Sequence, residues 1–180
     1  MAEIKSTLEL ALERTKKFAL SDKEREEIKQ KELREKIQSL FHRYGEGRLH
    51  LADLEKEIER MEEGVRKAVK EGLFKLWTEG LTLQGENEKF IKGIEWVKGQ
   101  SLGEWRESLR RLGDQYQNEK DQVALNFRAQ SLEALKREGF SGEAIEPNLK
   151  ANPSYQKALA DLEEKYRAHL DEMKRRLQES

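Results

Sequence analysis

The sequence contains no cysteine. A chain without thiols forms no disulfide, offers no thiolate nucleophile, and cannot bind zinc or iron–sulfur clusters through cysteine ligands. Only two prolines occur, Pro147 and Pro153, so no proline interrupts a helix before residue 147. The missing cysteines are typical of a reducing compartment, and the charged segment Met1–Thr7 lacks the apolar core of a signal peptide. These features predict a cytoplasmic protein.

Charge of a single sign is also missing. The 35 Lys and Arg residues nearly balance the 36 Asp and Glu residues, which leaves a net charge of −1. Binding to nucleic acids or to anionic membranes requires a patch of one sign, which this fine mixture disfavours. No apolar run approaches the roughly 18–20 residues of a membrane span. We therefore expect neither a membrane nor a nucleic-acid partner.

Charged residues make up 39% of the chain and hydrophobic residues only 36%. So little apolar material fills a compact core poorly, but it suffices for narrow seams between long helices. The apolar residues recur every three or four positions, and no run with a period of two competes. The predicted fold class is all-α: an elongated antiparallel helical bundle, or coiled-coil-like long helices, with a short-helix cap rich in glycine and aromatic residues.

The clearest periodic stripe predicts one helix of about thirty residues in the middle of the chain. Its seam then shifts by one position toward Val69, Leu73 and Trp77, as in a coiled-coil stutter. Gly64 and Gly72 lie inside this predicted helix, and a close crossing of another helix would explain both. The stripe consists of Leu51, Leu54, Ile58, Met61, Val65 and Ala68.

Local signals mark the ends of the other helices. Ser21–Glu24 and Ser101–Glu104 each have the pattern of a capping box at a helix start. Gly139 followed by Phe140 predicts a Schellman stop, and Asn152 followed by Pro153 predicts an N-cap with proline in the first helical position. Because Glu119 and Lys120 fall where the seam of the helix opened by Ser101 would continue, we expect loose or solvated packing there.

These boundaries predict the domain organisation. Residues 1–20 form a short N-terminal helix or arm, and residues 21–180 form the antiparallel helical bundle. The bundle contains a hairpin turn at 44–48, a cap insert at 80–103 and a loop at 139–152. The last helix carries a nearly pure heptad stripe from Tyr155 to Leu177. Thin seams would bury more surface in an assembly, so we expect a homodimer or a larger oligomer.

No motif predicts a catalytic, cofactor-binding or metal-binding residue. The histidines His42, His50 and His169 lack the Glu-x-x-His spacing of metal sites in helical bundles. His42 and His50 flank one turn, where an exposed pair is the expected reading rather than a shared metal. Adjacent carboxylates are expected by composition alone, and no glycine-rich phosphate loop is present. The sequence implies no cofactor and no small molecule.

Aromatic residues concentrate in and around the glycine-rich insert, which makes this segment the candidate partner-binding site. Tryptophan is enriched at interaction hot spots, but the same rings can form a local core where helices change direction. A mixed arrangement would bury Trp77 and Trp105 and present Phe90 or Trp96. The candidate residues are Phe74, Trp77, Phe90, Ile94, Trp96 and Trp105.

The sequence has apolar helical stripes but no catalytic, cofactor or metal motif. This combination favours a non-enzymatic helical interaction protein, namely a scaffold, adaptor or assembly factor that acts through helix–helix contacts. An alternative is a secretion or assembly chaperone that shields an amphipathic partner helix in a groove. An enzyme with a diffuse carboxylate site is the least favoured hypothesis. The expected partner is another protein or a second copy of the chain.

Overall fold

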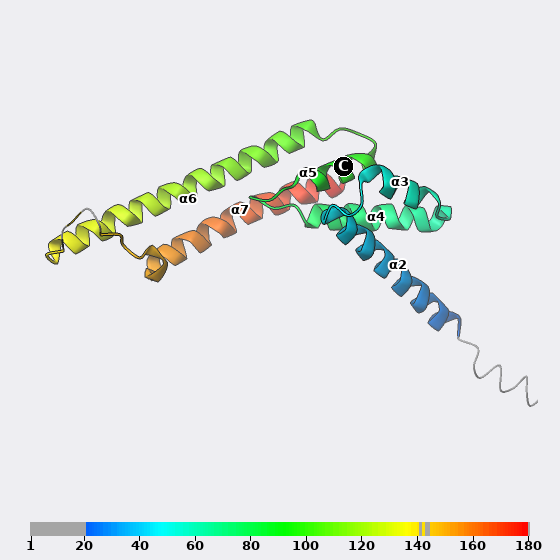
Figure 1. The fold of residues 1–180 in the computed structure, drawn as a ribbon, viewed down its shortest axis with the longest axis horizontal. Helices are drawn as coiled ribbons and strands as arrows, with labels where there is room; N and C mark the ends of the chain where they lie inside the picture. Colours follow the sequence, from blue (N-terminus) through cyan, green and yellow to red (C-terminus); the bar gives the residue numbers. More distant parts are fainter. Residues whose placement is uncertain (1–20, 141, 143–144, 180) are drawn as a thin grey trace, which may run out of the picture. The chain divides into compact units, whose positions relative to one another are not determined.

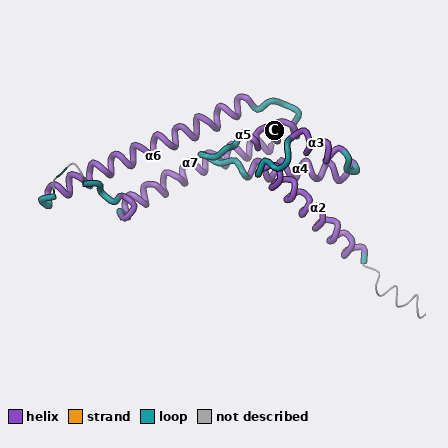
Figure 2. Tube along the Cα trace, in the orientation of Figure 1, coloured by secondary structure: helices purple, strands orange, loops and turns teal. Residues whose placement is uncertain are grey.

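The computed structural model describes residues 21–140, 142 and 145–179, and every regular element in them is a helix (Figures 1 and 2). The all-α class is therefore confirmed, whereas the helix or arm predicted for residues 1–20 lies outside the described residues. The elements are α2 (Asp22–Gly45), α3 (Leu51–Glu59), α4 (Glu63–Glu79), α5 (Glu88–Lys98), α6 (Gly103–Arg137), a 3₁₀ turn η1 (Leu149–Ala151) and α7 (Pro153–Glu179).

The chain divides into two compact units, unit 1 (Met1–Leu73) and unit 2 (Phe74–Ser180), and α4 contributes residues to both. The single bundle predicted over residues 21–180 stays a prediction. In the described part of the chain, no helix combines the length and the apolar character that crossing a membrane requires.

The capping box at Ser21 is confirmed at the start of α2. The Glu24 backbone N–H donates to Ser21 Oγ at 3.2 Å, and the Ser21 backbone N–H donates to the Glu24 carboxylate at 2.7 Å. The hydrogen bond from the Ser21 backbone lowers the pKa of Glu24. Residues 21–32 are all exposed, so caps and ion pairs between successive turns, such as Lys23–Glu27, support this part of α2.

A turn joins α2 to α3, but it covers residues 46–50 rather than the predicted 44–48. Helix α2 ends at Gly45, and Gly47 takes the left-handed conformation that the turn requires, with φ of 75°. Arg43 of α2 then forms an ion pair with Glu57 of α3 at 3.2 Å. The buried side chains of unit 1 come from α2, the turn, α3 and the first part of α4: Leu40, Tyr44, Leu49, Leu54, Ile58, Val69 and Leu73.

The prediction of one long helix through Leu51 and Trp77 is wrong, because the structure breaks it between Glu59 and Glu63. At the break, the Arg66 guanidinium donates to the backbone carbonyls of Glu59 at 2.8 Å and Met61 at 3.1 Å. These carbonyls would accept from backbone N–H groups in a continuous helix. The side chain of Arg66 replaces those donors, and no proline lies at the break to predict it.

The close crossing predicted at Gly72 is present, but the one predicted at Gly64 is not. A Cβ atom built on Gly72 would lie 2.6 Å from Cδ1 of Ile37, so α2 passes directly over this glycine. A Cβ atom on Gly64 would meet nothing within 4 Å. Gly64 instead occupies the first turn of α4, next to the break.

In unit 2, the last residues of α4 pack against α5 and against the end of α7. Trp77 is fully buried, and a Cβ atom on Gly93 of α5 would lie 2.8 Å from its ring. Lys174 of α7 donates from Nζ to the backbone carbonyl of Glu79 at 2.9 Å, and burial lowers the pKa of this lysine. A cation beside the carbonyl end of α4 is electrostatically favourable.

Helix α6 starts near the predicted position, but the predicted capping box at Ser101–Glu104 is wrong. Leu102 is the N-cap residue, and its side chain provides no capping hydrogen bond. The carboxylate of Glu95, on α5, accepts from the Leu102 backbone N–H at 2.8 Å and from Arg106 Nη2 at 3.1 Å. A carboxylate from another helix therefore satisfies the N-terminus of α6.

Helices α6 and α7 form an antiparallel hairpin (Figure 1). The start of α6 contacts the end of α7, and the end of α6 contacts the start of α7. Trp105 Nε1 donates to the Met173 carbonyl at 3.4 Å, and the rings of Phe127 and Tyr155 lie 5.5 Å apart. Between these two contacts, the rings of Tyr116 and Tyr166 also lie 5.4 Å apart. One stripe of each helix therefore forms the seam of the hairpin.

The far end of the hairpin has the predicted caps. The Phe140 N–H donates to the Leu135 carbonyl at 3.0 Å and the Gly139 N–H to the Lys136 carbonyl at 3.1 Å, which is the hydrogen-bond pattern of a Schellman motif. Gly139 has φ of 89°. At the start of α7, Asn152 Oδ1 accepts from the Ser154 N–H at 3.0 Å. Phe140 itself stays 59% exposed.

Of the two alternatives predicted at Glu119, loose or solvated packing, the structure shows a half-exposed contact that joins the two helices, with the Glu119 side chain 46% and the Lys165 side chain 52% exposed. Its carboxylate accepts from Lys165 Nζ at 2.9 Å and from the Tyr166 hydroxyl at 2.8 Å. Lys165 lowers the pKa of Glu119 most strongly, followed by Tyr166. Burial, reinforced by the bond to Glu119, raises the pKa of Tyr166 to about 12. We call this group the Glu119 clasp.

Replacing Gly93 by alanine should destabilise the protein, because the new methyl group would overlap the buried Trp77 ring. We expect a loss of about 1–3 kcal/mol in the free energy of unfolding, measured by urea titration. Gly64→Ala is the matched control: it adds a methyl group in open space on a helix and should gain up to about 1 kcal/mol. Equal effects from the two variants would contradict the contact with Trp77.

The Glu119 clasp should make the stability fall at alkaline pH. Between about pH 10, where an unfolded tyrosine loses its proton, and about pH 12, where Tyr166 loses its proton in the fold, the unfolded state is favoured progressively. Tyr166→Phe should flatten this part of a urea-unfolding pH profile. Tyr44 and Tyr116, whose pKa values burial also raises, account for a residual slope. An unchanged slope in Tyr166→Phe would rule out the assignment.

Candidate functional site

The six aromatic and aliphatic residues predicted as a partner-binding site belong to unit 2, where the structure divides them into two groups. Trp77 and Ile94 are fully buried and therefore belong to the core. The other four, Phe74, Phe90, Trp96 and Trp105, are half-buried. Partner binding by these half-buried residues stays a prediction.

Three of the half-buried rings have neighbours within the unit. The Phe90 ring lies against Gly80, where a Cβ atom would come within 2.9 Å of it. Lys98 Nζ lies 5.4 Å from the centre of the Phe74 ring, within the range of a cation–π contact. The indole N–H of Trp105 is directed to a carbonyl of α7. These contacts give the rings a structural role at the junction of α4, α5, α6 and α7.

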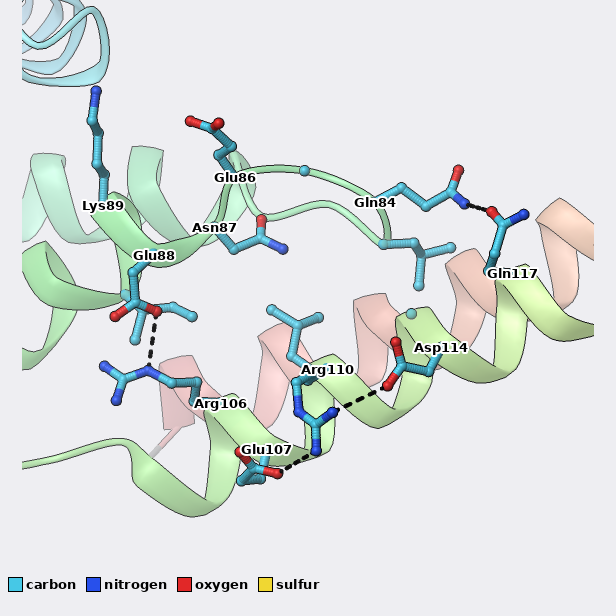
Figure 3. A pocket seen from close by; sticks show the side chains of 15 residues that line it. Gln84, Glu86, Asn87, Glu88, Lys89, Arg106, Glu107, Arg110, Asp114 and Gln117 are labelled. Atoms are coloured by element: carbon cyan, nitrogen blue, oxygen red, sulfur yellow. Dashed lines mark hydrogen bonds and ion pairs between the residues drawn. The ribbon is translucent and has the colours of Figure 1, made fainter.

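A groove of about 590 Å³ lies beside this junction, between the loop after α4 and one face of α6 (Figure 3). The loop contributes Leu83 and Gln84, the first turn of α5 contributes Glu88, and α6 contributes Arg106 and Arg110. No sequence pattern predicted this groove. Its lining is dispersed over thirty-five positions of ordinary polar sequence, and only the fold brings it together.

The charges of the groove neutralise one another. Arg106 forms ion pairs with Glu88 at 3.3 Å and Glu95 at 3.1 Å, and Arg110 forms ion pairs with Glu107 and Asp114. The hydrogen bond from Arg110 lowers the pKa of Glu107, and Glu107 in turn raises that of Arg110. Both guanidinium groups therefore already have carboxylate partners, so neither presents an uncompensated positive charge to an anionic ligand.

The described carboxyl groups with clearly shifted pKa values, Glu24, Glu107 and Glu119, are all lowered. A general acid that works near neutral pH requires a shift in the opposite direction. The described residues also contain no cluster of three or more histidine, aspartate or glutamate side chains that could hold a metal ion. The groove therefore offers two guanidinium groups that already have carboxylate partners and a hydrogen bond between Gln84 and Gln117.

The loop over the groove is closed on itself and rests on α6. The Asn87 side chain accepts from the Thr82 N–H at 2.9 Å and donates to the Thr82 carbonyl at 2.7 Å. Within this closed loop, the Gln84 side chain donates a hydrogen bond to the Gln117 side chain on α6. A Cβ atom on Gly113 would lie only 2.5 Å from the Leu83 carbonyl oxygen. Gly113 is thus what allows the loop to lie on the helix.

Past the loop, the hairpin becomes thin. The last buried layer consists of Tyr116, Leu162 and Tyr166. We call residues 117–161 the outer hairpin; none of its described residues (117–140, 142 and 145–161) is buried. Apolar side chains nevertheless continue along it, and Leu125 is 56% exposed. The outer hairpin is the second candidate surface, and the sequence signal for it was the continued apolar spacing.

Gly113→Ala should lift the loop off α6, because a methyl group cannot fit beside the Leu83 carbonyl oxygen. We expect faster amide hydrogen exchange in residues 82–87 and the first turn of α5, measured by mass spectrometry. Gly103→Ala on the same helix is the control, since the nearest atom to its new Cβ would be 3.8 Å away. Unchanged exchange in the Gly113 variant would show that the loop is held differently.

Comparison with known proteins returns no match at any of three levels: no family model, no curated protein and no solved structure is similar to this chain. The functional conclusions therefore rest on the geometry of the two candidate surfaces, the paired groove and the apolar outer hairpin.

Proposed function

We propose that this chain is a non-enzymatic helical interaction protein, a scaffold, adaptor or assembly factor, whose outer hairpin binds an amphipathic helix of a protein partner. The observation that carries the proposal is the absence of any buried residue among the described positions of the outer hairpin, although its apolar spacing continues. The groove is the weaker alternative, because its charges already satisfy one another.

The energetics of a two-helix hairpin support a partner at this surface. Two helices cover only one stripe of each other, so apolar residues outside that stripe keep their contact with water. Fully burying one leucine contributes about 1.5–3 kcal/mol relative to leaving it exposed. Leu125, which is 56% exposed, would gain roughly the exposed share of this energy when a third helix packs against it. A stable complex therefore needs several such contacts together, because association itself costs at least about 4 kcal/mol.

The charges flanking the outer hairpin favour a protein helix as the partner. Ion pairs between successive turns occupy both helices, including Arg137–Glu133 and Arg167–Glu163. Exposed pairs of this kind contribute little to stability but keep the helix surfaces soluble and of mixed sign. A helix with an apolar stripe and mixed flanking charges is complementary to such a surface, whereas a polyanion is not.

Photo-crosslinking in cells tests the proposal directly. A benzophenone amino acid at Leu125 should form crosslinks to a helical segment with apolar residues at three- and four-residue spacing, identified by mass spectrometry of the crosslinked peptide. The same amino acid at Arg111, exposed on the inner half of α6, is the control and should not reach that segment. If positions along the outer hairpin yield no protein crosslink, the proposed function is wrong.

A further inference from the structure

A stripe of six residues runs along α6 on the side facing away from α7. Val123 and Phe127 belong to the α7-facing stripe, as the contact between Phe127 and Tyr155 shows. Leu125 lies two positions from each of them, which places it about 200° around the helix and directs it to solvent. The outward stripe follows at spacings of three and four residues: Asn118, Asp121, Leu125, Arg128, Leu132 and Lys136.

When two copies of α6 lie antiparallel, their outward stripes match in apolar character and in charge. In an antiparallel pair whose centre lies between Arg128 and Ala129, Leu125 of one helix meets Leu132 of the other. The same centre brings Asp121 opposite Lys136, and both side chains are exposed in the structure. A two-fold axis repeats each of these contacts, so the pairing contains two Leu–Leu and two Asp–Lys contacts.

We infer that the partner at the outer hairpin is a second copy of this chain, bound through antiparallel packing of α6 on α6 around that centre. The inference rests on the proposed function and names its partner. A parallel pair in register would place Asp121 against Asp121, Arg128 against Arg128 and Lys136 against Lys136, three like-charge contacts that disfavour it.

The central charges are compatible with this packing. Arg128 comes close to its own symmetry mate, but Glu146 lies 3.5 Å from its guanidinium and offsets its charge. Asp121 accepts a hydrogen bond from Gln117 at 2.8 Å, which leaves a carboxylate oxygen for the lysine of the second copy. The apolar centre is narrow, so the dimer is expected to be weak and to depend on protein concentration.

Because the chain has no cysteine, single introduced cysteines report the geometry without background. With oxidised glutathione, Ala129→Cys, next to the axis, should form a disulfide-linked dimer. Asp121→Cys alone should not, because two copies of position 121 lie about 22 Å apart along an antiparallel pair. A mixture of Asp121→Cys and Lys136→Cys chains should form the mixed dimer. Gln130→Cys, on a different face of α6, is the control and should stay monomeric.

Charge reversal tests the same pairing without crosslinks. In sedimentation velocity, Asp121→Lys and Lys136→Asp should each raise the dimer dissociation constant about tenfold or more, because the axis doubles each repulsion. The double swap restores both contacts and should recover the original constant. Ile28→Glu, at a 43% exposed apolar residue of α2, is the control and should change nothing. Circular dichroism checks that every variant keeps its helicity.

The outcomes separate this inference from the proposed function. A monomer at every concentration, or disulfides at Asp121→Cys without Ala129→Cys, overturns the antiparallel dimer. If the benzophenone at Leu125 then links to a helix of another protein, the proposed function stands without it. If the linked peptide comes from α6 of a second copy and the double swap rescues dimerisation, both are supported.

Discussion

The last turns of α7 contact both the start of α6 and the end of α4. The rest of unit 2 depends on this contact. Trp105 donates to the Met173 carbonyl, and the next residue of α7, Lys174, donates to the Glu79 carbonyl. The second bond places a cation at the carbonyl end of α4, where the helix dipole favours it. Because α4 and α6 both contact one segment of α7, their adjoining ends are fixed. The short helix α5 and its two loops must span the distance between them. Gly93 makes this fit possible, because only glycine lets α5 lie on the Trp77 ring.

The register of the hairpin depends on a polar contact more than on its apolar ones. The ring pairs Tyr116–Tyr166 and Phe127–Tyr155 have preferred geometries, but other apolar side chains could supply the same burial after a slip along the seam, because burial itself is non-directional. The Glu119 clasp is less tolerant. Its carboxylate accepts from Lys165 and Tyr166 together, and a shift of one helical turn would leave the hydroxyl of buried Tyr166 without this acceptor. A charge in the seam thus adds specificity where leucines alone would not.

Much of the fold was predictable because its signals are local. The capping box at Ser21, the turn around Gly47 and the Schellman motif at Gly139 each depend on a few adjacent residues, so the sequence contains the whole cause. The heptad spacing also identified inward residues such as Leu54 and Ile58. The break before Glu63 could not be found this way, because its cause is an arginine that turns back from the next helix. The cap of α6 was mispredicted for a related reason. The carboxylate that accepts from the Leu102 N–H belongs to Glu95, on a different helix, and not to the predicted box of Ser101.

The same limit applies to the candidate sites. Composition singled out the aromatic residues around the insert, but burial depends on how helices meet, and it places Trp77 and Ile94 in the core. The groove was invisible in the sequence, since each of its charges is common in this chain and only the fold pairs Arg106 with Glu88. The outer hairpin was partly visible. Its apolar spacing was recognised, whereas the lack of covering elements became clear only from the structure.

One face of α6 changes its chemistry along its length, and this change explains where an interface can begin. On the inner half, Glu107, Arg110 and Asp114 form ion pairs along the helix beside the groove. Covering these groups would require removing their water with little new pairing in return, so this half is best left solvated. From Leu125 onward, the same face carries the exposed Leu125 and the half-buried Leu132, with Arg128 between them. There, contact with another helix removes apolar surface from water and leaves the charges at the rim, where they select the partner and its direction.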